Sequence, residues 1–268
     1  MTTHTQYLTG ASNNYVRAAA EAELYGKLGL MIQPGTTHYG HHIESFSSWA
    51  MDNGCFSKAG EFDGDQFLRE LERIIQTCSD AHEKCLFAVA PDVFDPVARK
   101  GDPIATLERS RPWFDRIREA GAPVAFVAQD GIEDLADAIP WEEFDVLFIG
   151  GSDEFKLGYP SGLSNGAPRY MVSPSGEVID QRSRRFFEML NTANQLGKGI
   201  HLGRANSMIR LAFAWEVGAE SADGTFLAMA GAKAGIDRVK KWFAGDKFNL
   251  IDELKLELEA RPVLPIAA

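Results

Sequence analysis

The sequence predicts a single α/β domain folded as a (β/α)₈ TIM barrel. Short, continuously apolar segments alternate with amphipathic segments, and at least seven of the apolar segments qualify as strands. This pattern is typical of a parallel sheet buried on both faces by helices. The length of 268 residues also suits one barrel, which commonly has about 250 residues. An open doubly wound sheet is the alternative, but the Gly-x-Gly-x-x-Gly turn after its first strand is missing.

Most of the elements follow from apolar periodicity and from the Gly, Pro and Asp residues that bound it. In the first half, we expect helices over residues 12–25, 62–78 and 102–120, and strands over 28–32, 49–56 and 86–90. In the second half, we expect strands over 124–128 and 144–149, a short helix over 133–138, a loop over 158–177 and a helix over 179–196. Residues 199–225 are expected to form strand, loop, helix and strand, before tail helices near 228–243 and 250–259.

Composition limits the classes of protein and partner. The formal net charge of −11 disfavours a polyanionic partner for the molecule as a whole. A local basic patch is still compatible with it, because Arg182, Arg184, Arg185, Lys198, Arg204 and Arg210 lie close together in the sequence. A solvated helix face explains that cluster equally well. The three cysteines form neither a disulfide framework nor a Cys-x-x-Cys pair.

The sequence also carries expectations about location. The N-terminal residues are polar and lack the order of a signal peptide. No apolar run reaches the roughly 18 residues of a membrane span, so we expect no membrane association and a cytoplasmic protein. The oligomeric state stays open, with a homodimer as one option.

Polar groups recur where the predicted strands end. Asp52, Asp92, Gln129 and Asp223 each stand at such an end, and Gly150-Gly151 and Gly203 present bare backbone at two others. In a barrel, the carboxyl ends of all strands meet at one mouth, where catalytic groups sit. Taken singly, an Asp before a Gly is usually a turn residue, so the prediction depends on the recurrence.

This set of groups suits chemistry at a glycosidic carbon. One carboxylate can attack carbon while a second passes a proton to or from the leaving group. A third carboxylate, an amide and exposed backbone can read the edge of a planar heterocycle, and glycine lets the backbone approach closely. The residues therefore favour base removal or base exchange at a nucleoside C1′.

Six short motifs, in this order and spacing, resemble the tRNA-guanine transglycosylase superfamily over roughly residues 28–230. They are Met51-Asp-Asn-Gly-Cys-Phe56, Ala90-Pro-Asp-Val93, Val127-Ala-Gln-Asp-Gly131, Phe148-Ile-Gly-Gly151, His201-Leu-Gly203 and Gly218-Ala-Glu-Ser-Ala-Asp223. The resemblance implies a barrel that exchanges guanine for a 7-deazaguanine by double displacement. For this chain we expect no cofactor and no bound metal.

The resemblance also implies a role for each matched residue. Asp223 is similar to the nucleophile and Asp52 to the general acid/base. Asp92 and Gln129 are similar to the residues that bind the base. Gly150, Gly151 and Gly203 are similar to its backbone contacts. Asn53, Cys55 and Asp130 differ from the family's usual residues at their positions.

The substrate expected from the resemblance is DNA. The tRNA enzymes carry a Cys-x-Cys-x-x-Cys…His zinc site near the C-terminus, whereas this chain has no cysteine after Cys85. It is more similar to the zinc-free DNA transglycosylases of phages and bacteria, which place 7-deazaguanines such as preQ0 into DNA. A guanine in DNA must leave the base stack to react, and Arg182, Arg185, Arg204 and Arg210 are then expected to hold phosphates.

Several other functions remain open from the sequence. A tRNA substrate is less favoured, and a nucleosidase or glycoside hydrolase would use the same two carboxylates with water as the acceptor. His38, His41 and His42 would have to supply the ligands of a metal-dependent hydrolase, although they lack the His-Glu-x-x-His spacing. A non-catalytic binding module is the last alternative.

Overall fold

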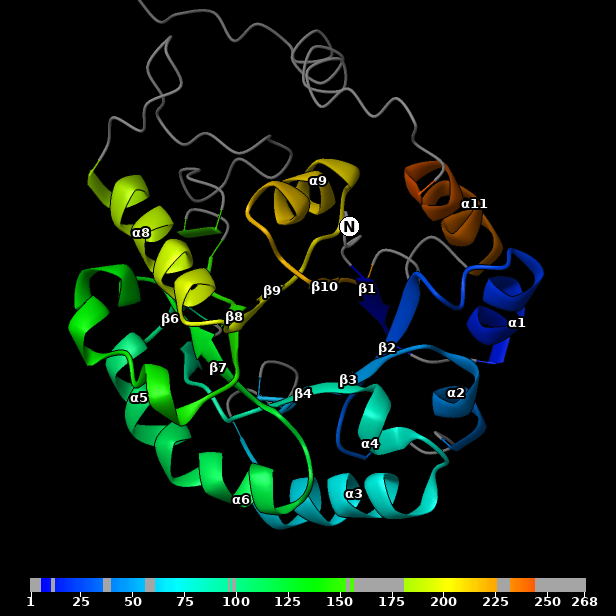
Figure 1. Cartoon of the computed structure of the whole chain (residues 1–268), viewed down its shortest axis with the longest axis horizontal. Helices are drawn as coiled ribbons and strands as arrows, with labels where there is room; N and C mark the ends of the chain where they lie inside the picture. Colours follow the sequence, from blue (N-terminus) through cyan, green and yellow to red (C-terminus); the bar gives the residue numbers. More distant parts are fainter. Residues whose placement is uncertain are drawn as a thin grey trace, which may run out of the picture.

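The computed structural model describes residues 6–10, 13–35, 40–55, 61–95, 97, 100–152, 155–156, 181–225 and 232–243. Eight parallel strands in this part of the chain close into a barrel, and helices surround it (Figure 1). Around the barrel the strands stand in the order β1, β2, β3, β4, β7, β8, β9 and β10, which pairs again with β1. The predicted closed parallel barrel with helices is therefore confirmed.

The barrel strands are short and mostly buried. They are β1 (Gln6–Thr9), β2 (Leu28–Ile32), β3 (Trp49–Met51), β4 (Cys85–Val89), β7 (Val124–Ala128), β8 (Val146–Ile149), β9 (Gly199–Leu202) and β10 (Ser221–Asp223). A separate antiparallel pair, β5 (Phe94–Asp95) with β6 (Lys100–Gly101), follows β4.

Strand β1 was not predicted, and it closes the ring. Its Leu8 lies opposite Asp223 of β10 on one side and opposite Gly29 of β2 on the other. The four residues of β1 contain two polar side chains, so the local sequence lacks the continuous apolar run that marks the other strands. The stability of β1 therefore comes from its pairing with β10 and β2 and not from its local sequence.

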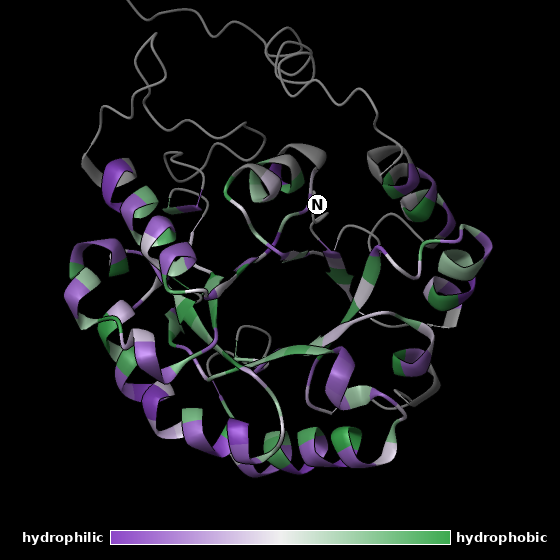
Figure 2. Ribbon diagram, in the orientation of Figure 1, coloured by the Kyte–Doolittle hydropathy of each residue, from purple (hydrophilic) through white to green (hydrophobic). Residues whose placement is uncertain are grey.

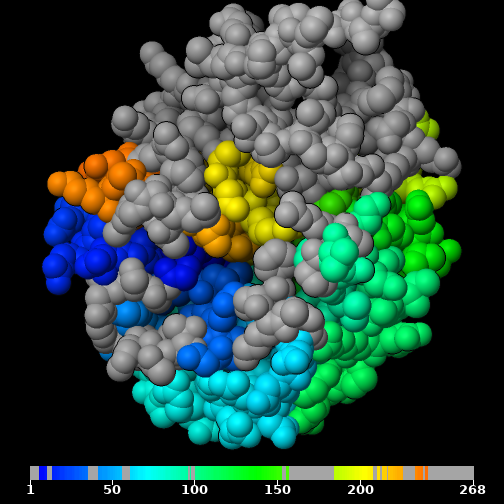
Figure 3. Space-filling model, turned by 180° about the vertical axis from the view of Figure 1, so that it is seen from behind, coloured from blue at the N-terminus to red at the C-terminus, as the bar shows by residue number. Residues whose placement is uncertain are grey.

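The helices lie outside the ring and follow each other in chain order, as the colours show from both sides (Figures 1 and 3). They are α1 (Asn13–Glu21), α2 (Gly40–Ser45), α3 (Gly64–Thr77), α4 (Ala81–Lys84), α5 (Pro103–Ser110), α6 (Phe114–Glu119), α8 (Gln181–Gln195), α9 (Met208–Glu216) and α11 (Ala232–Phe243). Three 3₁₀ segments accompany them: η1 (Arg111–Trp113), η2 (Ile132–Ala138) and η3 (Trp141–Glu143).

Two predicted helices differ from the structure. The helix expected over 102–120 is divided into α5, η1 and α6, because Pro112 has no backbone N–H to continue the α-helical ladder. The helix expected over 133–138 is the 3₁₀ segment η2. The predicted loop at 158–177 and the predicted tail helix at 250–259 lie outside the described residues.

Side-chain caps fix where several helices begin. The Asp63 carboxylate accepts a hydrogen bond from the backbone N of Gln66 at 2.9 Å, and Asp102 accepts one from Ala105 at 2.9 Å. Ser207 caps α9 in the same way. Each cap satisfies a backbone N–H that has no partner inside the helix. The positions of the caps therefore determine where these helices begin.

The apolar residues form two layers. Leu8, Ala50, Phe87, Ala125 and Val127 pack together inside the barrel, and a larger cluster fills the space between the sheet and the helices. The strands are predominantly in the hydrophobic colour, whereas the helices mix both colours along their length (Figure 2). This arrangement follows from strand geometry, because successive side chains of a strand point to opposite faces.

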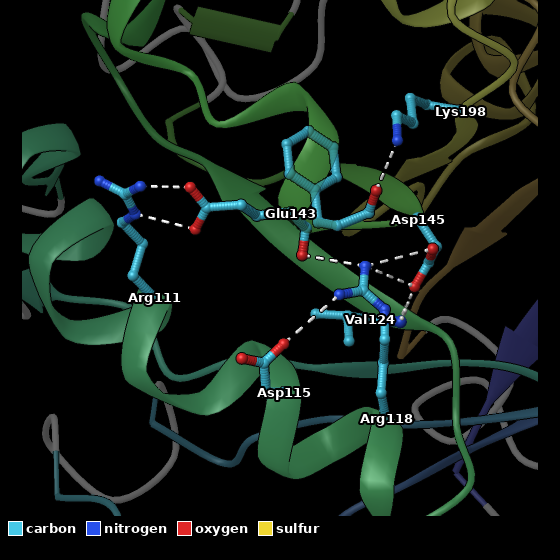
Figure 4. Close-up of polar contacts among 8 residues, drawn as sticks. Arg111, Asp115, Arg118, Val124, Glu143, Asp145 and Lys198 are labelled. Atoms are coloured by element: carbon cyan, nitrogen blue, oxygen red, sulfur yellow. Dashed lines mark hydrogen bonds and ion pairs between the residues drawn. The ribbon is translucent and has the colours of Figure 1, made fainter.

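A polar network ties the segments that lead into β7 and β8 (Figure 4). The carboxylate of Asp145 accepts hydrogen bonds from the backbone N of Val124 at 2.8 Å and from Arg118 Nη2 at 3.3 Å. Arg118 also donates to the carbonyl of Glu143, whose carboxylate pairs with Arg111. The network lies at the amino ends of the strands, the face of such barrels that serves stability.

None of the helices in the described part of the chain combines the length and apolarity that crossing a membrane requires.

Candidate active site

A cavity of about 390 Å³ lies at the carboxyl ends of the strands. Every barrel strand contributes to it, with lining residues that include Thr9, Gln33, Asp52, Asp92, Gln129, Gly150, Gly151, Gly203, Arg204 and Asp223. The volume falls in the range of small-molecule sites. The structure thus brings together all the residues that were predicted to be catalytic or to bind the base.

Strand alternation explains why these side chains meet. Ala50 and Val127 face the barrel interior, and Asp52 and Gln129 follow them by two positions. Residues two apart along a strand share a face. The same side of the sheet is therefore apolar within the barrel and polar at its mouth.

Asp52 has the surroundings of a general acid/base. Burial, together with the nearby carboxylates of Asp223 and Asp92, raises the pKa of its carboxyl to about 6 against the opposing hydrogen bond from Gln33. The Gln33 Nε2 atom lies 2.9 Å from Asp52 Oδ2. A group with a pKa near neutrality can both give and take a proton under working conditions.

Asp92 sits in a buried amide cluster. Its two carboxylate oxygens accept hydrogen bonds from Asn53 Nδ2 at 3.0 Å and from Gln129 Nε2 at 2.5 Å. Burial raises the pKa of Asp92, although these amides and Arg109 favour the charged form. Arg109 Nη1 also donates to the Asp92 carbonyl at 2.9 Å. The carboxylate is therefore held in a fixed orientation at the wall of the cavity.

Gln129 keeps one polar atom unused. Its side chain is 2% exposed, and among the residues that the structure describes no hydrogen bond reaches its Oε1 atom. Gly101 of the β5–β6 pair packs directly against this side chain, so that a Cβ there would lie 2.1 Å from Oε1. A buried acceptor without a partner is costly, and a bound ligand is one means of satisfying it.

Asp223 is held through one carboxylate oxygen. Its Oδ1 atom lies 3.0 Å from His201 Nε2 and accepts a hydrogen bond from the backbone N of Arg204 at 3.1 Å. The side chain is 19% exposed, whereas the His201 ring is fully buried. These two hydrogen bonds fix the orientation of the Asp223 carboxylate, which is the third carboxylate of the cavity.

The glycines of the site pack closely against neighbouring side chains of the protein. Gly151 has a φ of +68°, and a Cβ there would meet Asp130 Oδ2 at 2.7 Å. A Cβ on Gly203 would lie 2.7 Å from Phe148 Cε1. Side chains at these positions are therefore disfavoured, and the backbone itself forms this part of the wall.

The structure describes the side chains of three of the four arginines predicted to hold phosphates, and these three lie in two different places. Arg204 lines the cavity and donates to the Gly151 carbonyl, and Arg210 Nη1 donates to the Arg204 carbonyl at 3.3 Å. Arg185 instead pairs with Asp134, in a groove that is also lined by Glu133, Asp137 and Glu188. The side chain of Arg182 lies outside the described residues. Closeness in sequence did not translate into closeness in space, because Arg185 belongs to α8 and Arg204 to the mouth.

Among the described residues, none of the histidines and cysteines singled out as possible ligands lines the cavity, although Cys55 lies beside Asp92 and Asn53. His42 is buried on α2, while His38 and the side chain of His41 lie outside the described residues. No group of three His, Cys, Asp or Glu residues in the described ranges has the geometry to hold a metal ion. Cys55, Cys78 and Cys85 are buried free thiols.

Three functional contacts were missed by the sequence reasoning. Gln33 follows strand β2 as Asp52 follows β3, so the same strand-end pattern would have found it. Asn53 was noted only as a departure from the family, yet it holds Asp92. His201 lies inside a strand, where no pattern in the local sequence distinguishes it.

Comparison with known proteins gives no independent assignment. No protein-family model matches the chain, and no curated protein matches it. Its function is therefore inferred from the cavity and the side chains that line it.

Proposed function

We propose that this chain is a (β/α)₈ TIM-barrel DNA-guanine transglycosylase. It exchanges guanine in DNA for a 7-deazaguanine base, such as preQ0, through a covalent Asp223–glycosyl intermediate. The observation that carries the proposal is the meeting of three carboxylates with different surroundings in one cavity. Asp52 has a raised pKa, Asp92 is held by amides, and Asp223 is held through a single oxygen.

The first step cleaves the bond to guanine. A carboxylate oxygen of Asp223 forms a bond to C1′ as the C1′–N9 bond breaks, and the electron pair of that bond goes to the leaving base. Asp52, protonated in a fraction of molecules near neutral pH because its pKa is about 6, supplies the proton that neutralises the base. The sugar is then held as an ester of Asp223.

The second step reverses the first with a new base. The carboxylate of Asp52 takes the N9 proton of the 7-deazaguanine, N9 attacks C1′, and the ester bond to Asp223 breaks. Both steps pass through charge at the anomeric carbon, which carboxylates stabilise. The sequence of bond changes needs neither a metal nor a cofactor.

The base is recognised at the wall formed by Asp92 and Gln129. A carboxylate accepts from the donor edge of guanine, and the side chain of Gln129, which lines the same wall, is expected to contact the base. The backbone around Gly150, Gly151 and Gly203 offers carbonyl and N–H groups, and Phe148 lines the same cavity with an apolar face. A 7-deazaguanine keeps the same donor edge, so one wall serves both bases.

DNA is the favoured polymer because the chain after Cys85 lacks the cysteines of the zinc site in the tRNA enzymes. The target guanine would leave the stack to enter the cavity. We expect Arg204, which lines the cavity, and Arg210, which donates to the Arg204 carbonyl, to meet the phosphate backbone. A cytoplasmic setting fits such a substrate. The alternative polymer is tRNA.

A nucleosidase or glycoside hydrolase is the alternative reaction. The raised pKa of Asp52 suits protonation of a leaving group whether a base or water then attacks the intermediate. The two reactions differ only in the acceptor. They are distinguished by whether the sugar ends bonded to a new base or to the oxygen of water.

Exchange of isotope-labelled guanine into guanine-containing DNA tests the proposal. The wild-type protein is expected to incorporate label into intact DNA, and Asp223→Ala to lose incorporation by at least about 10³-fold, as removal of a nucleophile does. Asp115→Ala, a change at a side chain that is 92% exposed on α6, is the control and should exchange like the wild type. Release of base without incorporation would favour the hydrolase, and incorporation into tRNA alone would replace DNA as the substrate.

A further inference from the structure

His201 occupies the floor of the cavity, inside the barrel. Its neighbours along β9, Ile200 and Leu202, pack on the opposite face of the strand in the layer beneath the helices. The imidazole is fully buried, with its ring centroid 4.9 Å from that of Phe87 and 4.5 Å from that of Phe148. A polar ring in this apolar layer is costly unless both nitrogens are hydrogen-bonded.

Both nitrogens find partners on the next strand. His201 Nδ1 lies 2.8 Å from Ser221 Oγ, and Nε2 lies 3.0 Å from Asp223 Oδ1. The pairing of β9 with β10 sets this geometry, because His201 stands directly opposite Ser221. Asp223 follows Ser221 by two residues on the same face, so one ring spans both side chains.

The consequence concerns the two oxygens of the Asp223 carboxylate. Oδ1 is engaged by His201 Nε2 and by the backbone N of Arg204. Within the part of the chain that the structure describes, no hydrogen bond is made to Oδ2. Two donors on one oxygen fix the rotation of the carboxylate and distinguish the oxygen that holds from the oxygen that is free to react.

We infer that His201 is a positioning residue that anchors Asp223 through Oδ1, so that Oδ2 is the oxygen that attacks C1′. The inference rests on the proposed function. Ser221 donates its hydroxyl proton to Nδ1 and thereby keeps the imidazole proton on Nε2, facing the carboxylate. A nucleophile held this way needs no reorientation when the sugar arrives, and misplacement of a reacting group by about 1 Å costs on the order of 10²-fold in rate.

The matched pair of variants is His201→Phe and His201→Gln. Phenylalanine keeps a ring between Phe87 and Phe148 but removes both hydrogen bonds. Glutamine gives up the ring but places an amide N–H close to the position of Nε2. A purely structural role predicts that the ring matters, whereas a positioning role predicts that the donor matters.

The rate of covalent adduct formation in a single turnover separates these roles. We expect His201→Phe to slow adduct formation by about 10- to 100-fold with unchanged affinity for the free base, and His201→Gln to recover most of the loss. His82→Gln serves as the control, because His82 lies on α4 and contacts the carbonyl of Gly121. A folded His201→Phe protein with the wild-type rate, or a Gln variant as slow as Phe, would overturn the inference.

A second measurement does not depend on catalysis or on the ring variants. In ¹⁵N NMR spectra of protein labelled at histidine, His201 should show a protonated Nε2 and an unprotonated Nδ1. Asp223→Asn should shift the Nε2 signal, and Ser221→Ala should allow the other tautomer. If wild-type protein exchanges no base, the proposed function fails, while this spectrum still decides whether His201 holds Asp223. A proton found on Nδ1 alone would contradict the arrangement.

Discussion

At the scale of single residues, Asp52 and Asp223 share a cavity but meet different surroundings. Asp52 is hydrogen-bonded by a neutral amide and lies in the field of two other carboxylates, which together with burial raise its pKa to about 6. Asp223 receives its contacts through one oxygen from His201 and Arg204. Environments that differ in this way separate the roles of acid and nucleophile between two chemically identical side chains.

The raised pKa of Asp52 has a cost in stability. The folded-state pKa of about 6 lies above the ordinary carboxyl value of 3.8, so between these values the native protein binds more protons than the unfolded chain. The free energy of unfolding therefore falls as the pH rises from about 4 to about 6 and stays reduced above that window. The ionised carboxylate therefore destabilises the fold above about pH 6.

Replacing Asp52 by Asn should remove this cost. We expect Asp52→Asn to unfold at a higher denaturant concentration than wild type at pH 8, with a gain of about 1–3 kcal/mol, because one pKa unit corresponds to about 1.4 kcal/mol. The gain should vanish below about pH 4, while base exchange is lost. Urea titrations at several pH values measure it, with the exposed Asp115→Asn as the control. An Asp52→Asn protein no more stable than wild type at pH 8 would show that the carboxyl is not perturbed.

The residues of the site were predictable to different degrees. Asp52, Gln129 and Asp223 could be found because a polar residue that ends an apolar run is visible in the local sequence. His201 could not, because its role depends on the pairing of β9 with β10, which no local pattern encodes. The phosphate cluster stays a prediction, and its spacing in the sequence did not indicate that Arg185 pairs with Asp134 on a neighbouring segment.

At the scale of elements, strands were easier to predict than the connections between them. The bounds of β2 and β7 match the prediction, because continuous apolar runs end there at Pro or Gly or begin after them. Strand β1 was missed because its stability comes from partners on both sides. The β5–β6 pair was missed because each of its strands has two residues, too few for any periodicity.

At the scale of elements, the Asp145 network leads to a prediction about stability. The Asp145 carboxylate holds the backbone N–H at the start of β7 and the guanidinium of Arg118 on α6. Asp145→Ala leaves that N–H without its acceptor, and we expect a loss of about 1–3 kcal/mol in the free energy of unfolding. Because the network lies at the amino ends of the strands, the rate of base exchange by the folded variant should be unchanged.

The matched control is again on α6. Asp115 also approaches Arg118, at 3.9 Å, but its side chain is 92% exposed, so Asp115→Ala should change the free energy of unfolding by less than about 0.5 kcal/mol. Equal effects of the two variants in chemical denaturation would show that Asp145 acts as an ordinary surface charge. If the folded Asp145→Ala protein lost base exchange, the network at the amino ends of the strands would have to influence the site at their carboxyl ends.

At the scale of the whole molecule, closure of the barrel creates the site. Side chains from residues 33 to 223 reach one cavity because eight parallel strands end at the same rim. The Asp145 network and the carboxylates of the cavity occupy opposite ends of the strands. With a formal net charge of −11, the proposed DNA substrate would depend on local basic groups such as Arg204 at the cavity.

The most direct measurement is mass spectrometry of the protein mixed with guanine-containing DNA and quenched during turnover. A proteolytic fragment containing residue 223 should carry the mass of a deoxyribose chain attached through an ester, and this adduct should disappear when a 7-deazaguanine base is added in excess. Asp223→Ala should yield no adduct, whereas Asp115→Ala should yield as much as the wild type. An adduct on any other residue, or exchange of base without an adduct, would contradict the covalent role of Asp223.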